Sequence, residues 1–228
     1  MQPTRTLPTE GQGMSNSSLG DFQTRFPSST ADVAGAQWAW RDTDPQSDRI
    51  PVVFLPGAGG TGDVFYRSVQ ALQDSRRVIT IRYPALPDID AIVSGLAGLM
   101  ERIGVRYADV AASSLGGYVA QALAIEHPSL IRRVLFGNSF FDASWLQAKL
   151  SRDALLATPS ADHLARTVAQ LEGLPEDTPE QLDYKTTMLA LAGPEQTGDM
   201  ARAALAAVLG SSPLPRQISL PARSRVTR

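Results

Sequence analysis

The stretch Asp109–Pro128 reads DVAASSLGGYVAQALAIEHP, in which a short apolar run is followed by a sharp turn and an alanine-rich helical segment. At the turn, Ala112-Ser113-Ser114-Leu115-Gly116 matches the small-x-Ser-x-Gly pattern of a serine held between a strand and a helix. In this frame Ser114 is a candidate nucleophile at a helix N-terminus, where backbone N–H groups favour a developing negative charge. The alternative is a serine that only caps an ordinary strand-to-helix turn.

Apolar runs and helical stripes alternate on both sides of this turn, which predicts an α/β fold with a mostly parallel sheet and flanking helices. The predicted strands are Gln37–Arg41, Ile50–Leu55, Arg77–Tyr83, Asp109–Ser113 and Ile131–Gly137. Helices are predicted over Asp88–Ile103 and Leu115–Glu126, and Gly104 stands where a C-terminal glycine cap belongs.

The sequence changes character after this alternation. Helices are predicted over Phe141–Leu156, His163–Leu171, Pro179–Leu191 and Gly198–Leu209. We expect a disordered N-terminal tail over residues 1–30, an α/β core over 31–142, a helical cap over 143–212, and the start of a further, incomplete core strand over 213–228. The C-terminal strands of the fold are then expected to be missing from this chain, which leaves a sheet edge exposed.

The glycine-rich loop Pro56–Gly62 (PGAGGTG) follows the first buried strand. In an acyl-transfer site, the backbone N–H groups of Ala58 and Leu115 are the candidate oxyanion-hole donors. A different interpretation is that Gly57–Gly62, which fits G-x-G-x-x-G, binds NADP and that Arg82 meets its 2′-phosphate. Pro56 and the serine turn downstream favour the first interpretation.

Taken together, the PGAGG loop, Tyr83-Pro84, the ASSLGG turn and Gly137-Asn138-Ser139-Phe140-Phe141-Asp142 resemble the α/β-hydrolase fold, and maspardin-like members in particular. The likeness extends from about Trp38 to Gln147. It implies a fold shared by esterases, lipases, C–C hydrolases and dehalogenases, whereas the maspardin-like branch resembles binding proteins. The chain departs from this pattern at Pro56-Gly57, where the family usually has His-Gly.

A catalytic triad of this fold has the chain order serine, acid, histidine. Two histidines follow Ser114, and His127 ends the predicted helix roughly 18 Å along its axis, too far for proton transfer. His163 in the cap is the candidate base, with a solvent-facing helical histidine as the alternative. Asp142 after a predicted strand is the candidate acid, with a helix N-cap as the alternative. The triad is therefore expected to be incomplete.

Composition limits the other classes of function. The 228 residues carry a formal net charge of −2, with no cysteine and two histidines. No basic excess supports a nucleic-acid partner or an anionic membrane surface, and we expect no metal and no cofactor. No signal peptide is recognised, so a cytoplasmic location is expected. Because the only lysines are Lys149 and Lys185 and the helices are rich in alanine, a bacterial source is expected.

These features predict an ester or acyl hydrolase in which Ser114 attacks a small apolar ester or acyl substrate. Turnover is expected to be weak or absent, because the serine has no well-placed base. The alternatives are a non-catalytic, maspardin-like interaction protein with a protein partner, and an NADP-binding oxidoreductase that uses Gly57–Gly62.

Overall fold

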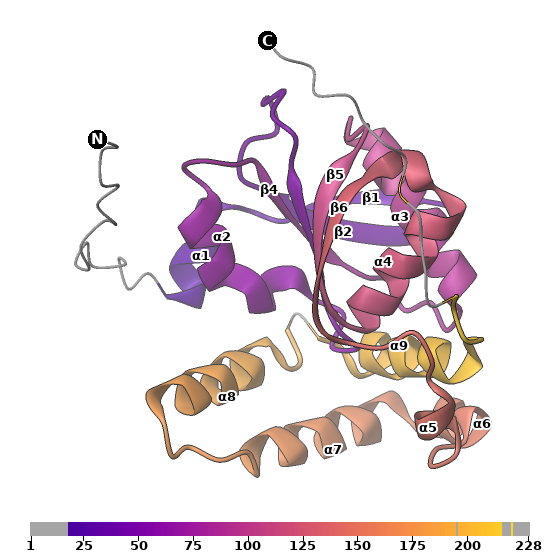
Figure 1. The fold of residues 1–228 in the computed structure, drawn as a ribbon. Helices are drawn as coiled ribbons and strands as arrows, with labels where there is room; N and C mark the ends of the chain where they lie inside the picture. Colours follow the sequence, from indigo (N-terminus) through magenta and orange to yellow (C-terminus); the bar gives the residue numbers. More distant parts are fainter. Residues whose placement is uncertain (1–17, 195, 216–219, 221–228) are drawn as a thin grey trace, which may run out of the picture.

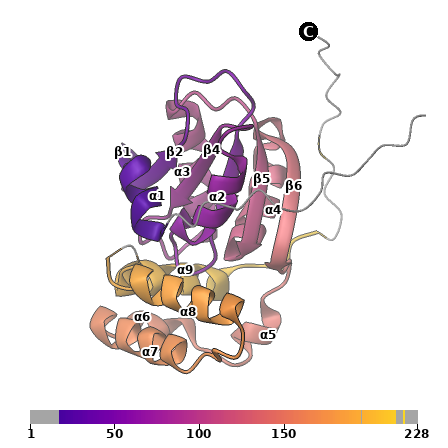
Figure 2. The ribbon, with the colours of Figure 1, turned by 90° about the vertical axis from the view of Figure 1, so that its left-hand side faces the viewer.

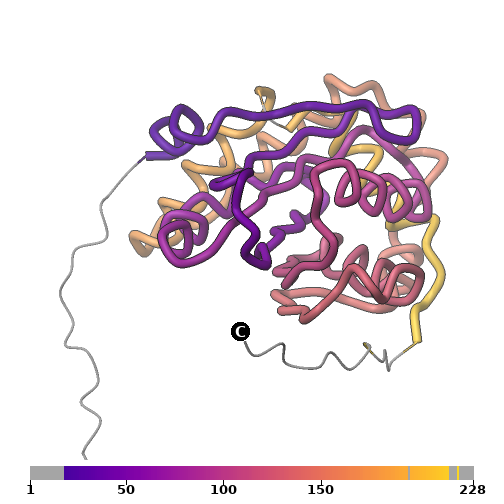
Figure 3. Tube along the Cα trace, turned by 90° about the horizontal axis from the view of Figure 1, so that it is seen from above, coloured from indigo at the N-terminus to yellow at the C-terminus, as the bar shows by residue number. Residues whose placement is uncertain are grey.

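The computed structural model describes residues 18–194, 196–215 and 220, and its centre is a six-stranded sheet (Figure 1). The strands are β1 (Ser29–Val33), β2 (Ala36–Asp42), β3 (Val52–Leu55), β4 (Val78–Arg82), β5 (Ala108–Ser114) and β6 (Ile131–Ser139). They lie in the order β1-β2-β4-β3-β5-β6, with β1 and β6 at opposite edges (Figure 3). The strands β4, β3, β5 and β6 pair in parallel, while β2 is antiparallel to both its neighbours, so the predicted mostly parallel sheet is confirmed.

The order of the strands indicates where a site belongs. After β3 the chain forms β4 on one side of it and then crosses to form β5 on the other side. In open α/β sheets, ligands bind outside the carboxyl ends of the strands at such a reversal. The glycine-rich loop follows β3, and Ser114 is the last residue of β5. Both candidate segments therefore lie at the topological switch point.

Helices cover both faces of the sheet (Figure 2). On one face lie α1 (Leu19–Arg25) and α2 (Tyr66–Leu72), and on the other lie α3 (Ile89–Arg102) and α4 (Leu115–Glu126). The single turns η1 (Gly62–Phe65) and η2 (Pro128–Leu130) are 3₁₀ helices. Asp88 caps α3 by accepting the Ala91 N–H at 3.0 Å, and Gly104, at φ +72°, follows the end of α3 as predicted.

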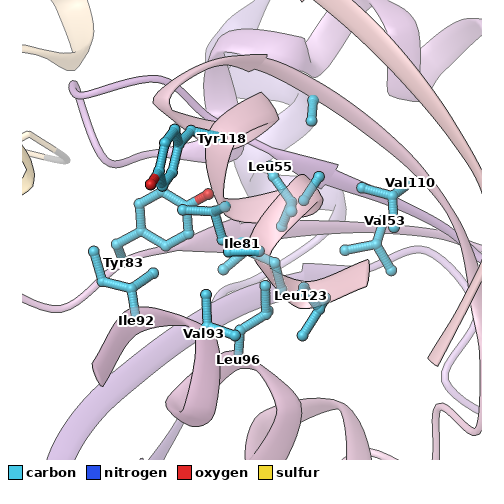
Figure 4. Close-up of a cluster of buried hydrophobic side chains, with 14 of the residues drawn as sticks. Val53, Leu55, Ile81, Tyr83, Ile92, Val93, Leu96, Val110, Tyr118 and Leu123 are labelled. Carbon is cyan, nitrogen blue, oxygen red and sulfur yellow. The ribbon is translucent and has the colours of Figure 1, made fainter. Parts of the chain in front are cut away.

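The main core lies between the sheet and the α3–α4 layer, as Figure 4 shows. Leu55, Leu96 and Leu123 are completely buried. From β4, Ile79 and Ile81 lie on this side of the sheet, whereas Val78 lies on the opposite side in a second buried cluster. The buried apolar runs thus account for strands that are covered on both faces.

The helices that follow β6 gather below the carboxyl edge of the sheet (Figures 1 and 2). They are α5 (Ser144–Gln147), α6 (Arg152–Ala157), α7 (Ser160–Glu172), α8 (Pro179–Leu191) and α9 (Gly198–Gly210). Ala204, Ala207 and Val208 of α9 join the main core, whereas α7 packs on α8 and α9. The single helix predicted over Phe141–Leu156 is wrong: Ser151 accepts the Ala154 N–H at 3.2 Å and so begins a second helix, α6.

The structure also differs from the sequence-based expectation near the N-terminus. Residues 18–30 were expected to belong to a disordered tail, but they form α1 and the beginning of β1. Ser18 and Asp21 form a capping box, and Phe22 and Phe26 pack with Tyr66 in a second buried cluster. Residues 1–17 lie outside the described residues.

Most of the strand predicted over residues 213–228 also lies outside the described residues, and residues 213–215 are not in a strand. In the part of the chain that the structure describes, no helix is long and apolar enough to cross a bilayer.

Candidate active site

Ser114 adopts a backbone conformation that is rare for residues other than glycine. Its φ is +51° and its ψ is −121°, at the point where β5 ends and α4 begins. Its hydroxyl makes no capping hydrogen bond to α4, so Ser114 does not behave as an ordinary capping serine. Strain of this kind persists only where the surroundings enforce it, and it is common at functional sites.

The small residues around Ser114 allow β3 and its loop to approach the turn. A β-carbon on Gly116 would lie 2.2 Å from the Leu55 carbonyl oxygen and 2.6 Å from that of Pro56. A β-carbon on Gly57 would lie 3.3 Å from the Ser114 β-carbon and 3.8 Å from its Oγ. The structure therefore brings the Ser114 hydroxyl and the start of the glycine-rich loop together. Ala58 comes next in this loop, and Leu115 is the fully buried first residue of α4.

The end of β6 holds the serine turn from the other side. Asn138, at φ +48°, interrupts the register so that Ser114 pairs with Ser139. The Ser139 hydroxyl donates to the Ser114 carbonyl oxygen at 3.0 Å, and a β-carbon on Gly117 would lie 2.0 Å from Ser139 Oγ. This contact of Ser139 was not predicted from the sequence. Its only signal was Asn138, a residue type that tolerates positive φ.

Backbone hydrogen bonds stabilise the conformation of the glycine-rich loop. The Gly60 N–H donates to the Gly57 carbonyl at 3.0 Å, and the Tyr83 N–H donates to the Gly60 carbonyl at 2.8 Å. The Tyr83 side chain is buried, and this burial raises the pKa of its hydroxyl, which therefore stays neutral.

The glycines of this loop face protein atoms. β-carbons on Gly59, Gly60 and Gly62 would meet Gln196, Met200 and Thr80, respectively. The α-helix that follows begins only at Tyr66, after the turn η1, whereas a dinucleotide-binding loop opens directly into a helix. This geometry favours the acyl-transfer interpretation of Gly57–Gly62 over NADP binding.

The two remaining triad candidates occupy different surroundings. Asp142 accepts a hydrogen bond from the Ser144 N–H at 2.8 Å and another from the Ser144 hydroxyl, which favours its alternative role at the start of α5. His163 lies on α7, in the helical layer farther from the sheet (Figure 2), and its pKa is lowered by burial, Arg202 and Arg166. Among the described residues, no hydrogen bond joins the Ser114 hydroxyl to either side chain.

His127 follows the last residue of α4, at the opposite end of that helix from Ser114. The described residues contain no group of three or more His, Cys, Asp or Glu side chains that could hold a metal ion. The candidate site therefore consists of a strained serine, a helix N-terminus and a glycine-rich loop.

Comparisons with known proteins agree with the fold. The sequence model of the alpha/beta hydrolase family matches residues 52–224. Maspardin of Danio rerio is 31% identical over 126 residues, which cover 54% of this chain and 40% of that protein. Maspardin of Homo sapiens is 36% identical over 110 residues, which cover 47% of this chain and 36% of that protein. The chain thus spans less than half the length of these relatives.

Among solved structures, a hydrolase from Pseudomonas aeruginosa PA01 has a TM-score of 0.63 and 20% sequence identity. The superposition covers 81% of this chain and 73% of that one. At this identity the likeness is one of fold.

Proposed function

Since the chain belongs to the α/β hydrolase family, we propose that it is a serine-dependent ester or acyl hydrolase with Ser114 as nucleophile. The observation that carries this proposal is the positive φ of Ser114, whose hydroxyl caps nothing and lies beside the loop that contains Ala58. A residue held in this conformation at the switch point of the sheet fits the requirements of an exposed nucleophile.

In the proposed reaction, Ser114 Oγ attacks the carbonyl carbon of an ester or acyl substrate and transfers its proton to a solvent water. The carbonyl electron pair moves onto the oxygen, which accepts hydrogen bonds from the N–H groups of Ala58 and Leu115. Collapse of this intermediate expels an alkoxide, which takes a proton from solvent. A water then attacks the acyl carbon, the carboxylic acid leaves, and a proton returns to Ser114 Oγ. Since no described histidine bonds to Ser114, we expect slow turnover, roughly 10²–10⁴-fold below that of a site with a positioned general base.

The test is hydrolysis of p-nitrophenyl acetate by the wild type, Ser114→Ala and Ser113→Ala. Ser113 is the matched control because it is the neighbouring serine and does not fit the motif. If Ser113 were the nucleophile, the position that requires glycine would be occupied by Leu115. We expect a rate above buffer for the wild type and Ser113→Ala, and the buffer rate for Ser114→Ala. Mass spectrometry should find the acyl group on Ser114 when hydrolysis of the intermediate is slow. Equal rates for the wild type and Ser114→Ala would overturn the proposal.

A second candidate function is a non-catalytic interaction protein. The specific observation in its favour is the similarity to maspardins, together with a Ser114 hydroxyl that bonds to no described histidine. This function predicts that a purified protein partner binds the wild type and Ser114→Ala with the same affinity while neither hydrolyses esters. A loss of binding in Ser114→Ala would count against it.

A further inference from the structure

Gln196, in the connection between α8 and α9, is a buried polar residue outside the elements considered so far. Only 3% of it is exposed. Its backbone is fixed, because its N–H donates to the Leu191 carbonyl at 2.9 Å and its carbonyl accepts the Gly193 N–H at 3.0 Å. The side-chain Nε2, however, is buried and has no hydrogen-bond partner among the described residues. Buried amide donors are nearly always paired, so this exception needs an explanation.

The unpaired amide lies on the glycine-rich loop beside Ser114. A β-carbon on Gly59 would be 2.5 Å from Gln196 Nε2, so a glycine is required for the side chain to lie there. Gly59 directly follows Ala58, and the residue before Ala58, Gly57, lies against Ser114. Figure 1 shows the α8–α9 connection near the ends of the central strands, where this loop begins. The cap therefore places an N–H donor on the same short loop that contacts the candidate nucleophile.

The donor has no structural task that accounts for it. It makes no hydrogen bond to a described carbonyl group of the loop, so it does not hold the loop in place. Met200 of α9 also packs on this loop, at Gly60, but its side chain is apolar. Gln196 Nε2 is therefore the polar group where these two side chains meet the loop. An acceptor oxygen supplied by a ligand would satisfy the amide.

We infer that Gln196 is a substrate-binding residue whose Nε2 donates to an acceptor oxygen on the acyl part of the substrate. The inference rests on the proposed function and specifies its substrate class. Acyl groups with an ether, hydroxyl or carbonyl oxygen close to the reacting carbon are preferred over purely alkyl acyl groups. The expectation of a small apolar substrate is thereby replaced, because an alkyl chain leaves the buried amide unpaired.

A kinetic test uses p-nitrophenyl methoxyacetate and p-nitrophenyl butyrate, which differ by an oxygen in place of a methylene group. For each ester, kcat/KM is divided by the rate constant for its hydrolysis by hydroxide, which corrects for intrinsic reactivity. The corrected value for methoxyacetate is then divided by that for butyrate, and this ratio is compared between the wild type and the variants. We expect this ratio to fall about tenfold in Gln196→Leu, as for the loss of one hydrogen bond. Gln170→Leu, on the exposed surface of α7, is the matched control and keeps the wild-type ratio. An unchanged ratio in Gln196→Leu would overturn the inference.

A binding test needs no turnover. In ¹H–¹⁵N spectra, the side-chain amide signal of Gln196 is identified by its loss in Gln196→Leu or, if that variant does not fold, in Gln196→Met. Titration of the wild type with methoxyacetamide should move this signal downfield, whereas butyramide should not. Equal responses to the two amides, or no response, would contradict the assignment.

The two tests separate this inference from the function on which it rests. A selective shift without Ser114-dependent hydrolysis supports the Gln196 site and overturns the proposed hydrolase. Ser114-dependent hydrolysis with an unchanged ester ratio and no selective shift supports the hydrolase and overturns the Gln196 site.

Discussion

Gly116 determines whether the turn at Ser114 can form. In Gly116→Ala the new β-carbon would lie 2.2 Å from the Leu55 carbonyl oxygen, which belongs to the backbone of β3 and cannot rotate away. We expect the free energy of unfolding to fall by about 1–3 kcal/mol, because α4 must move away from the sheet. Urea denaturation followed by circular dichroism measures this change, and any ester hydrolysis that depends on Ser114 should be lost.

The matched control for this substitution is Gly137→Ala in β6. A β-carbon there has only the Ala112 carbonyl oxygen nearby, at 3.9 Å, and Gly137 does not have a positive φ. We expect unchanged or slightly increased stability, since alanine restricts the unfolded chain. Equal destabilisation by the two substitutions would show that the close approach at Gly116 is not the cause.

Because of His163, the free energy of unfolding should decrease as the pH falls. Burial, Arg202 on α9 and Arg166 on α7 lower its pKa below the ordinary value of 6.5. As the pH falls below 6.5, the unfolded chain therefore binds a proton before the folded chain does, and the folded state loses stability. Urea denaturation above and below this pH should show a smaller acid-induced loss for His163→Gln than for the wild type. The same loss in both proteins would contradict the assignment.

At the scale of elements, a buried ion pair joins β2, η1 and α1. Arg41 Nε lies 2.9 Å from Asp63 Oδ1, Arg41 Nη1 donates to the Phe26 carbonyl at 2.7 Å, and Gln23 Nε2 donates to Asp63 Oδ2 at 2.9 Å. Asp63→Ala removes the carboxylate that pairs with the buried Arg41 guanidinium. We expect a loss of about 3–5 kcal/mol in the free energy of unfolding, measured by urea denaturation.

The exposed pair between Arg67 and Asp183 provides the control, since it joins the same types of side chain at the surface. Asp183→Ala should cost at most about 1 kcal/mol, because water screens the two charges. A similar cost for Asp63→Ala would mean that the buried network contributes little.

The sequence predicted best those elements whose signals are local. Leu115–Glu126 and Pro179–Leu191 are helices with the predicted ends, because a small-residue turn and His127-Pro128 bound the first and Pro179 begins the second. The helix α1 was missed because its stability depends on Phe22 packing against Tyr66, a residue far along the chain. The same difference holds for the candidate site. Ser114 could be predicted from the residues of its own turn, whereas the contacts of Ser139 and Gln196 depend on which distant segments meet.

At the scale of the whole molecule, β6 forms an edge of the sheet, and within the described residues no strand pairs with its outer side. Leu135 and Phe136 of β6 are 71% and 49% exposed. An exposed apolar edge strand favours pairing with another copy of the chain. We therefore expect light scattering to show larger species as the protein concentration rises, and fewer of them in Leu135→Lys.

The control is Leu182→Lys, which places the same charge on an exposed leucine of the helix α8. One added positive charge brings the formal net charge of −2 closer to zero, so electrostatic repulsion between molecules becomes weaker in both variants. A decrease in association confined to Leu135→Lys must therefore come from the blocked strand edge. An equal decrease in both variants would show that association does not depend on β6.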